Sequence, residues 1–275
     1  MEVLYGLRVL NLAVNIPGPA AARTLSRMGA NLVKVEPPAG DPMESYHSEW
    51  YRDMAAGQTI VKLDLKASEG RQHLFGLLEE TDLLITGTRP AALERLELDW
   101  MTLHRKFPRL CQAAIVGYPH PRENEAGHDL AYQASLGLFA PPHMPRTLLA
   151  DMAGAEQMVA ASLALLLGRE RGQGSGYAEV ALSAAAAAMA EPLRYGLTAP
   201  GGLLGGAIPE YNLYQTSDGW IAVVALEPHF RKRMEAELGV KHLEEYRSVF
   251  RQKSAAQWEQ WGRQLDIPVV AVKWA

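Results

Sequence analysis

Apolar runs and helical segments alternate along the first 118 residues, and this alternation limits the possible folds more than any other feature of the chain. The run LRVLNLAV has the composition of a buried strand, and AAARTLSRMG is typical of a short helix that ends at Gly29. The run NLVKVEPP indicates a second strand, which Pro37 and Pro38 stop. Two strands joined through a helix form a βαβ unit, whose strands pair in parallel.

The same alternation continues as far as Tyr118. Further strands are expected at residues 59–65, 82–87 and 110–118, and helices at residues 68–81, 90–98 and 99–107. Ser68 is a candidate N-cap for the first of these helices. The pattern predicts an α/β fold with a Rossmann-like large domain, in which a mostly parallel sheet carries helices on both faces. The loop NIPGPAAA after the first strand lacks the GxGxxG pattern, so the sequence has no nicotinamide-binding fingerprint there.

The pattern changes after Asp151. Residues 153–172 predict one long helix, and residues 172–196 predict a turn through glycines into an alanine-rich helix. Alanine side chains permit close helix packing, although alanine also has high helix propensity on its own account.

A stretch dense in glycine and proline, residues 198–212, is the best candidate for a linker between domains. The large domain would then cover residues 1–197. Asp218 and Gly219 mark the turn of a hairpin within the segment that follows. We therefore expect residues 213–275 to form a smaller α+β domain.

Composition excludes several classes of function. The formal net charge is -4 and no basic run is interleaved with aromatic residues, so a nucleic-acid partner is not expected. The longest apolar run, MVAASLALLLG, is too short to span a bilayer, and no secretory signal precedes the first strand. Cys111 is alone, which excludes an internal disulfide and fits a cytoplasmic location. Neither HExxH nor CxxC spacing occurs, so we expect no metal site.

The stretch NEAGHDLAYQASLG places a His-Asp pair where a loop runs into an apolar segment. Asp129 could cap a helix at this junction. His128 has no comparable structural reason to be there, and an imidazole titrates near neutral pH, so His128 is a candidate general base. The alternative is an ordinary surface histidine.

Six segments, in this order along the chain, resemble those of the family III coenzyme A transferases, and more closely the alpha-methylacyl-CoA racemase branch. The segments are GLRVLNL...PGP...MGANLVKVEPPAGDP, LDLKASEGR, TGTRPAALERLEL, GHDLAYQA, LLADMAGA and SDGWIAVVALEPHF. The resemblance runs from Gly6 to about Val272. It implies that the large domain binds coenzyme A as part of an acyl-CoA substrate, with no tightly bound cofactor.

The resemblance also assigns catalytic residues. The family aspartate falls on Asp151, a residue that would otherwise be interpreted as a helix N-cap. In transferases this carboxylate attacks an acyl thioester, whereas in racemases it exchanges a proton with the adjacent carbon. The racemase branch carries a histidine at the position of His128 and a glutamate at that of Glu227. His128 and Asp151 then serve as opposed acid and base, Glu227 orients His128, Asp129 is structural, and amides that follow Asp151 stabilise the enolate.

For coenzyme A itself, the resemblance implies contacts from six positions. These positions are Asn15, Ile16, Leu63, Lys66, Arg89 and Arg95. Two departures from the family pattern bear on the nucleotide site: Pro38 replaces an arginine, and MAAGQT replaces an Asn-Arg-Gly-Lys type of stretch. Relatives continue beyond Ala275 with a segment that returns to the large domain, so the small domain is expected to be shortened at its C-terminus, which bears on activity.

The function expected from these observations is inversion of the α-carbon of 2-methyl-branched acyl-CoA thioesters through an enolate. A transferase that moves CoA between carboxylic acids through an acyl-aspartyl intermediate is the alternative within enzymes. A non-catalytic acyl-CoA binder is a further alternative, which the altered nucleotide loops favour. A homodimer is expected, because subunits of this family interlock.

Overall fold

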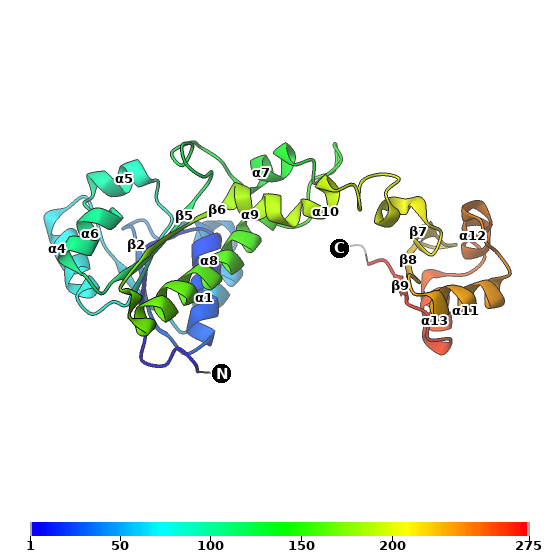
Figure 1. The fold of residues 1–275 in the computed structure, drawn as a ribbon, viewed down its shortest axis with the longest axis horizontal. Helices are drawn as coiled ribbons and strands as arrows, with labels where there is room; N and C mark the ends of the chain where they lie inside the picture. Colours follow the sequence, from blue (N-terminus) through cyan, green and yellow to red (C-terminus); the bar gives the residue numbers. More distant parts are fainter. Residues whose placement is uncertain (1, 274–275) are drawn as a thin grey trace. The chain divides into compact units, whose positions relative to one another are not determined.

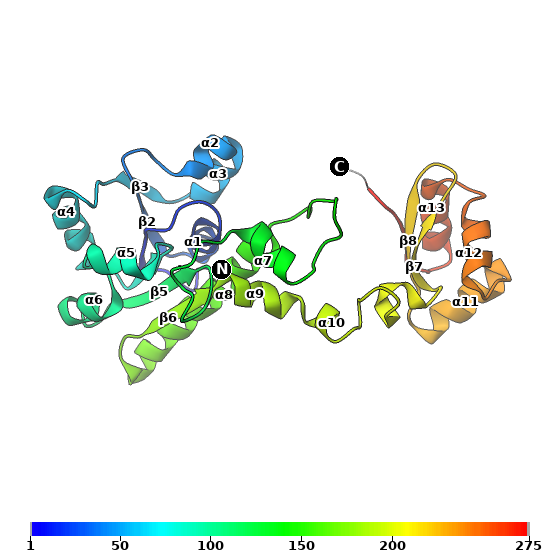
Figure 2. The same ribbon diagram turned by 90° about the horizontal axis from the view of Figure 1, so that it is seen from above.

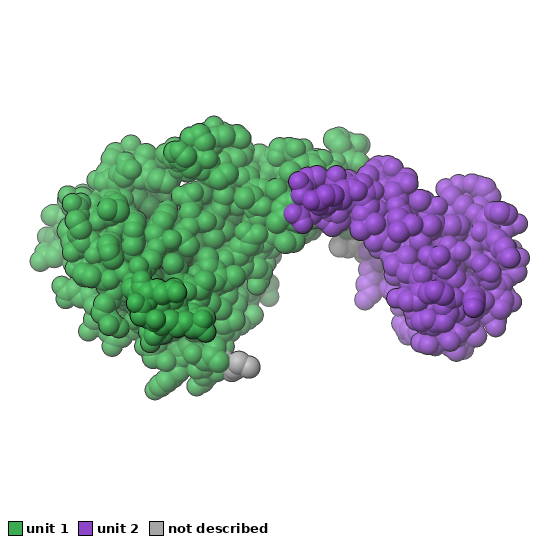
Figure 3. Space-filling model, in the orientation of Figure 1, with its two compact units in different colours: residues 1–189 green, residues 190–275 purple. Residues whose placement is uncertain are grey.

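The structure is a computed structural model that describes residues 2–273, and it divides into two compact units, residues 1–189 and 190–275 (Figure 3). Each unit has its own hydrophobic core. The stretch 198–212, expected as a linker, belongs to the second unit and contains a π-helical turn, Leu203–Ala207.

A six-stranded parallel sheet forms the centre of the described part of the first unit (Figure 1). Its strands are β1 (Arg8–Asn11), β2 (Asn31–Glu36), β3 (Thr59–Lys62), β4 (Leu83–Thr86), β5 (Cys111–Val116) and β6 (Tyr177–Ala181). Their spatial order is β3-β2-β1-β4-β5-β6, which is the order of the Rossmann fold. The predicted α/β class and parallel sheet are therefore confirmed.

Helices cover both faces of this sheet (Figures 1 and 2). Side chains along the strands point alternately into two hydrophobic cores, one on each face. One face packs against α1 (Pro17–Arg27), α3 (Ser48–Ala55), α8 (Leu149–Gly168) and α9 (Leu182–Met189), and the other against α4 (Ser68–Leu78), α5 (Pro90–Arg95) and α6 (Trp100–Lys106). In β4, Leu83 and Ile85 enter the first core and Leu84 enters the second. This period of two, with every position buried, is what a central parallel strand requires.

The sequence analysis missed β6. Residues 177–181 were expected within a turn leading to a helix, but they pair in parallel with β5 at the edge of the sheet. Their burial is confined to the last two residues, so the apolar signal is too short to mark a strand. The alanine-rich helix α9 follows directly, from Leu182. Ser68 was also misassigned, because α4 begins at Ser68 and Ala67 occupies the N-cap position.

Helix α8, together with the π-helical turn Arg169–Gln173, is long and apolar enough to cross a membrane by length and composition alone. It packs against α1, α9, β5 and β6 within the first unit. The helix thus lies on the sheet, and these contacts bury part of its apolar surface, including Met158, Val159 and Leu166.

The second unit joins a small antiparallel sheet to a layer of helices. The sheet contains β7 (Tyr211–Gln215), β8 (Trp220–Val224) and β9 (Val269–Ala271), and it shares a core with the helices α11 (Pro228–Leu238), α12 (Leu243–Phe250) and α13 (Ala255–Gln264). The short helix α10 (Glu191–Arg194) precedes them and contributes no buried residue. The predicted hairpin is present as β7 and β8. Phe250 lies in the core between Tyr214 and Trp258, with ring centroids 4.8 and 5.0 Å away. The mixed α+β character expected here is confirmed.

Candidate active site

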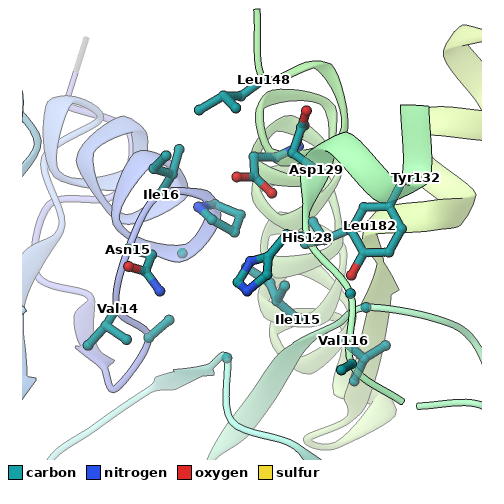
Figure 4. Close-up of a pocket in the computed structure, with 18 of the residues that line it drawn as sticks. Val14, Asn15, Ile16, Ile115, Val116, His128, Asp129, Tyr132, Leu148 and Leu182 are labelled. Carbon is teal, nitrogen blue, oxygen red and sulfur yellow. The ribbon is translucent and has the colours of Figure 1, made fainter. Parts of the chain in front are cut away.

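A cavity of about 540 Å³ opens at the carboxyl ends of the strands in the first unit (Figure 4). The strand order reverses between β1 and β4, and in open parallel sheets the ligand crevice lies outside such a reversal. Residues 13–18, which follow β1, line one side, and Gly87 and Arg89, which follow β4, line another. Most of the remaining wall comes from the end of β5, the loop 123–128, and the first turns of α7 (Asp129–Ser135) and α8, and Tyr46 and Leu182 complete it. A volume of this size suits a small-molecule site.

His128 stands at the N-terminus of α7 and lines the cavity. It occupies the N-cap position with extended backbone dihedrals, but its side chain caps no amide. Figure 4 shows the imidazole projecting into the space opposite Asn15 and Ile16. The residue predicted to act as a base is therefore accessible to a ligand, and its ring is not used to stabilise the helix.

Asp151 also lines the cavity, from the first turn of α8. The helix begins at Leu149 and Leu148 holds the N-cap position, so the interpretation of Asp151 as an N-cap is wrong. Its backbone N–H donates to Asp129 Oδ1 at 3.0 Å. The carboxyl group is thus available to a ligand while the main chain fixes its position.

Burial, followed by the nearby charge of Asp129, raises the pKa of Asp151 to about 7. Both causes act in the same direction, because an ionised carboxylate loses hydration in the cavity wall and meets a second negative charge there. At neutral pH the Asp151 carboxyl therefore exists in comparable amounts as acid and as base. A group with such a pKa can both give and take a proton.

Asp129 holds the two helices of the site together, as its expected structural role requires. Its side chain is almost fully buried. While Oδ1 accepts from Asp151 on α8, Oδ2 accepts from Gln133 Nε2 at 2.5 Å, and the same Nε2 donates to the Thr147 carbonyl at 2.9 Å. Asp129 directly follows His128, so one carboxylate fixes the relative placement of His128 and Asp151.

Tyr132 is a residue of the site that the sequence analysis missed. It is fully buried, lines the cavity, and its hydroxyl has no hydrogen-bond partner among residues 2–273. A Cβ atom at Gly127 would lie 2.6 Å from this hydroxyl oxygen, so glycine is required where the loop crosses the ring. Burial raises the pKa of Tyr132 to about 12, which keeps the hydroxyl protonated. The spacing of four from His128, one helical turn, was the available signal.

The structure brings together some of the predicted CoA-binding residues. Asn15, Ile16 and Arg89 line the cavity with His128 and Asp151. Leu63 packs in the core on the α4 side of the sheet, and the exposed Lys66 and Arg95 lie away from the cavity lining.

Glu227 belongs to the second unit, where it holds the N-cap position of α11. Its pairing with His128 stays a prediction. The expected enolate donors near Asp151 need correction, because the Met152 N–H bonds to the Leu148 carbonyl and the Asp151 N–H bonds to Asp129. Those two amides are occupied within the protein.

Comparison with known proteins gives a consistent result. A family model described as CoA-transferase family III matches residues 4–273. Alpha-methylacyl-CoA racemase from Homo sapiens is 29% identical, over 93% of this chain and 74% of the racemase. Succinyl-CoA--D-citramalate CoA-transferase from Chloroflexus aurantiacus is 27% identical, over 87% of this chain and 66% of the transferase. The fold is also that of a hypothetical protein from Mycobacterium tuberculosis, with a TM-score of 0.85, 24% identity, and coverage of 99% of this chain and 86% of that one.

The raised pKa of Asp151 predicts a pH-dependent gain in stability for Asp151→Asn. Between the ordinary aspartate pKa of 3.8 and about 7, the unfolded chain has released this proton and the folded chain retains it, so wild-type stability falls as pH rises. Above pH 7 the buried charge is fully present. The neutral amide avoids that charge, so the melting temperature of Asp151→Asn should exceed that of the wild type most at pH 8 and least near pH 4. Thermal melts across this range test it.

The exposed carboxyl of Glu237 provides a control, since Glu237→Gln removes one carboxyl from the surface of α11. If the Asp151→Asn difference is the same at pH 4 and pH 8, burial does not raise the pKa of Asp151.

Proposed function

The chain belongs to CoA-transferase family III, and we propose that within this family it is an acyl-CoA racemase acting on 2-methyl-branched acyl-CoA thioesters. Members of the family include racemases and CoA-transferases, as the two curated relatives illustrate. The observation that carries the choice is the Asp151 carboxyl, which faces a cavity shared with His128 and has its pKa raised to about 7.

The proposed reaction is proton exchange at the carbon next to the thioester carbonyl. A base removes the α-hydrogen as a proton, and the electron pair of the C–H bond moves onto the carbonyl oxygen to form an enolate. An acid on the opposite face then delivers a proton to the same carbon, and the carbonyl re-forms. His128 takes the proton from one configuration while Asp151 gives one back, and the roles reverse for the other configuration.

The presence of His128 on the same cavity as Asp151 favours this reaction over acyl transfer. A carboxyl with a pKa of about 7 is well matched to general acid–base work at neutral pH. Acyl transfer needs only the Asp151 carboxylate as its nucleophile, whereas inversion needs a second acid–base group, and His128 lines the same cavity as Asp151. The apolar lining from Ile115, Leu148 and Leu182 fits a branched hydrocarbon better than a dicarboxylate.

Arg89 and Arg95 are proposed to meet the phosphates of the CoA nucleotide. Arg89 holds the N-cap position of α5 at the cavity, and Arg95 lies on the exposed last turn of the same helix. An anionic ligand that leaves the cavity along α5 would pass both guanidinium groups. Glu227 is proposed to orient His128.

Removal of either arginine should weaken CoA binding. A charge-assisted contact typically contributes about 1.5–3 kcal/mol, so Arg89→Ala and Arg95→Ala should each raise the dissociation constant of CoA roughly ten-fold or more. Calorimetric titration at low salt measures this, with Arg105→Ala on the exposed surface of α6 as the control. An unchanged affinity removes that arginine from the site.

We propose a homodimer as the assembly. Helix α9 buries Ala185 and Ala186 against the first unit and leaves Ala184 and Ala188 exposed, which permits close approach of a second helix. Light scattering at micromolar concentration should give twice the chain mass of 30.2 kDa. A single-chain mass under these conditions contradicts the proposal.

The racemase reaction predicts α-hydrogen exchange with solvent. In heavy water, a 2-methylacyl-CoA of either configuration should gain deuterium at the α-carbon while its thioester stays intact, because deprotonation needs no acceptor acid. His128→Ala and Asp151→Ala should each slow inversion in both directions by roughly 10²-fold or more, the usual contribution of a general acid or base. Mass spectrometry and chiral analysis of the recovered acyl group measure both effects.

The matched control is His143→Ala, which removes an exposed histidine outside the cavity lining and should leave exchange unchanged. Acceptor-dependent movement of CoA, with no deuterium in the product from any branched substrate, would establish the transferase reaction instead. Binding of CoA without either reaction would identify a non-catalytic binder.

A further inference from the structure

A buried ionic cluster lies beside the loop that lines one wall of the cavity. Lys34, on β2, has its Nζ 2.9 Å from Glu36 Oε1 and 2.6 Å from Asp41 Oδ2. All three side chains are almost completely buried. Tyr51 from α3 donates its hydroxyl to Glu36 Oε1 at 2.8 Å and places its ring 4.8 Å from Lys34 Nζ. The proposed acid–base chemistry uses none of these groups.

Asp41 connects this cluster to the cavity. Its Oδ1 accepts two backbone amides, from Asn15 and from Met43, each at 2.9 Å. The first belongs to the loop after β1, and the second opens helix α2 (Pro42–Tyr46), which carries the cavity residue Tyr46. One carboxylate, held by Lys34 on its other oxygen, therefore ties together two segments that both contribute to the cavity.

Asn15 has a strained backbone at this point of attachment. Its φ angle is +68°, in the left-handed region that asparagine tolerates better than most residues. Figure 4 shows its side-chain amide nitrogen on the side of His128. The amide oxygen is buried and has no hydrogen-bond partner within residues 2–273. Strain and an unsatisfied polar group together, in a cavity wall, are typical of a functional position.

We propose that Asp41, held by Lys34, is a positioning residue that fixes the backbone of Asn15 so that the Asn15 side-chain amide hydrogen-bonds the acyl-pantetheine arm of the substrate. The proposal rests on the proposed function, because it takes an acyl-CoA as the ligand. In this arrangement Asn15 contacts the substrate near the thioester, where His128 is proposed to act, and Arg89 contacts the nucleotide.

The energetics of buried ions support a positioning role. Bringing one cation and two carboxylates out of water costs much of what their attraction returns, so apolar residues of the same volume would stabilise the fold at least as well. The ionic cluster supplies a fixed hydrogen-bond acceptor, Asp41 Oδ1, which holds the backbone of Asn15 in its left-handed conformation. That acceptor is needed where the loop must keep one conformation before the ligand arrives.

Two substrates and one glycine substitution test the contact. Asn15→Gly removes the amide and keeps the backbone, because glycine adopts a φ of +68° without strain. We expect the dissociation constants of a 2-methylacyl-CoA and of the matching 2-methylacyl-pantetheine to rise by the same factor, roughly three- to ten-fold for one neutral hydrogen bond. Arg89→Ala should weaken only the acyl-CoA, since the pantetheine thioester has no nucleotide.

The positioning role of Asp41 is tested by measuring whether its effect on binding requires the Asn15 side chain. Asp41→Ala should raise both dissociation constants, and this increase should largely disappear in the Asn15→Gly background, because the two residues act in series. Asp41→Asn keeps an acceptor oxygen for the Asn15 amide and should recover most of the affinity. If Asp41→Ala does not fold, Lys34→Met, alone and combined with Asn15→Gly, provides the same cycle, because it removes the cation that holds Asp41 Oδ2.

Asp82→Ala is the matched control. Asp82 also accepts a backbone amide, that of Arg8 at 2.9 Å, and pairs with Arg169 at 2.9 Å, but it precedes β4 at the opposite end of the sheet from the cavity. Its loss should lower the melting temperature and leave both dissociation constants unchanged.

Unchanged binding of both thioesters by Asn15→Gly overturns the proposal, as does an effect of Asp41→Ala that persists in full without the Asn15 amide. The proposed function fails separately, if the wild type binds the thioesters but exchanges no α-hydrogen.

Discussion

The carboxylate of Asp129 joins the two helices that carry the proposed acid and base. It follows His128 at the start of α7 and accepts the backbone amide of Asp151 on α8, so one buried side chain links the segments that carry these two residues. The same negative charge contributes to the raised pKa of Asp151. Asp129 therefore influences both the position and the protonation of Asp151, and a substitution at Asp129 would change both.

Much of the fold could be predicted from the sequence, because the type of each strand or helix shows in its own residues and the alternation of strands and helices repeats along the chain. Strands such as β4 and β5 are buried at every position and alternate with helices along the chain, so their type and their place in a mostly parallel sheet were predicted from the alternation alone. Strand β6 could not be predicted in this way. Its residues Tyr177 and Glu179 are exposed at the sheet edge, and the strand becomes visible only when β5 offers it a partner. Tertiary pairing decides such segments.

Part of the site could also be predicted from the sequence, and part could not. His128 and Asp151 were predicted through a resemblance in sequence motifs, and the structure places both on one cavity. The pKa of Asp151 depends on burial and on a carboxylate 22 residues away in the sequence, which no local motif encodes. Asp41 escaped prediction for the same reason, because it holds the backbone of Asn15, 26 residues away in the sequence. Tyr132 lies close to Gly127 in the sequence, and only the tight fit of its ring against that glycine marks it as part of the site.

One aspartate can in principle serve two chemistries, and its environment selects between them. The Asp151 carboxylate can attack a thioester as a nucleophile or take a proton from the adjacent carbon as a base, and its protonated form can return that proton. Burial in the cavity wall and the charge of Asp129 raise the pKa of Asp151, and both depend on how α7 and α8 meet. In the proposed racemase, the packing of α7 against α8 therefore sets both the position of Asp151 in the cavity wall and the fraction of its carboxyl that is protonated at neutral pH.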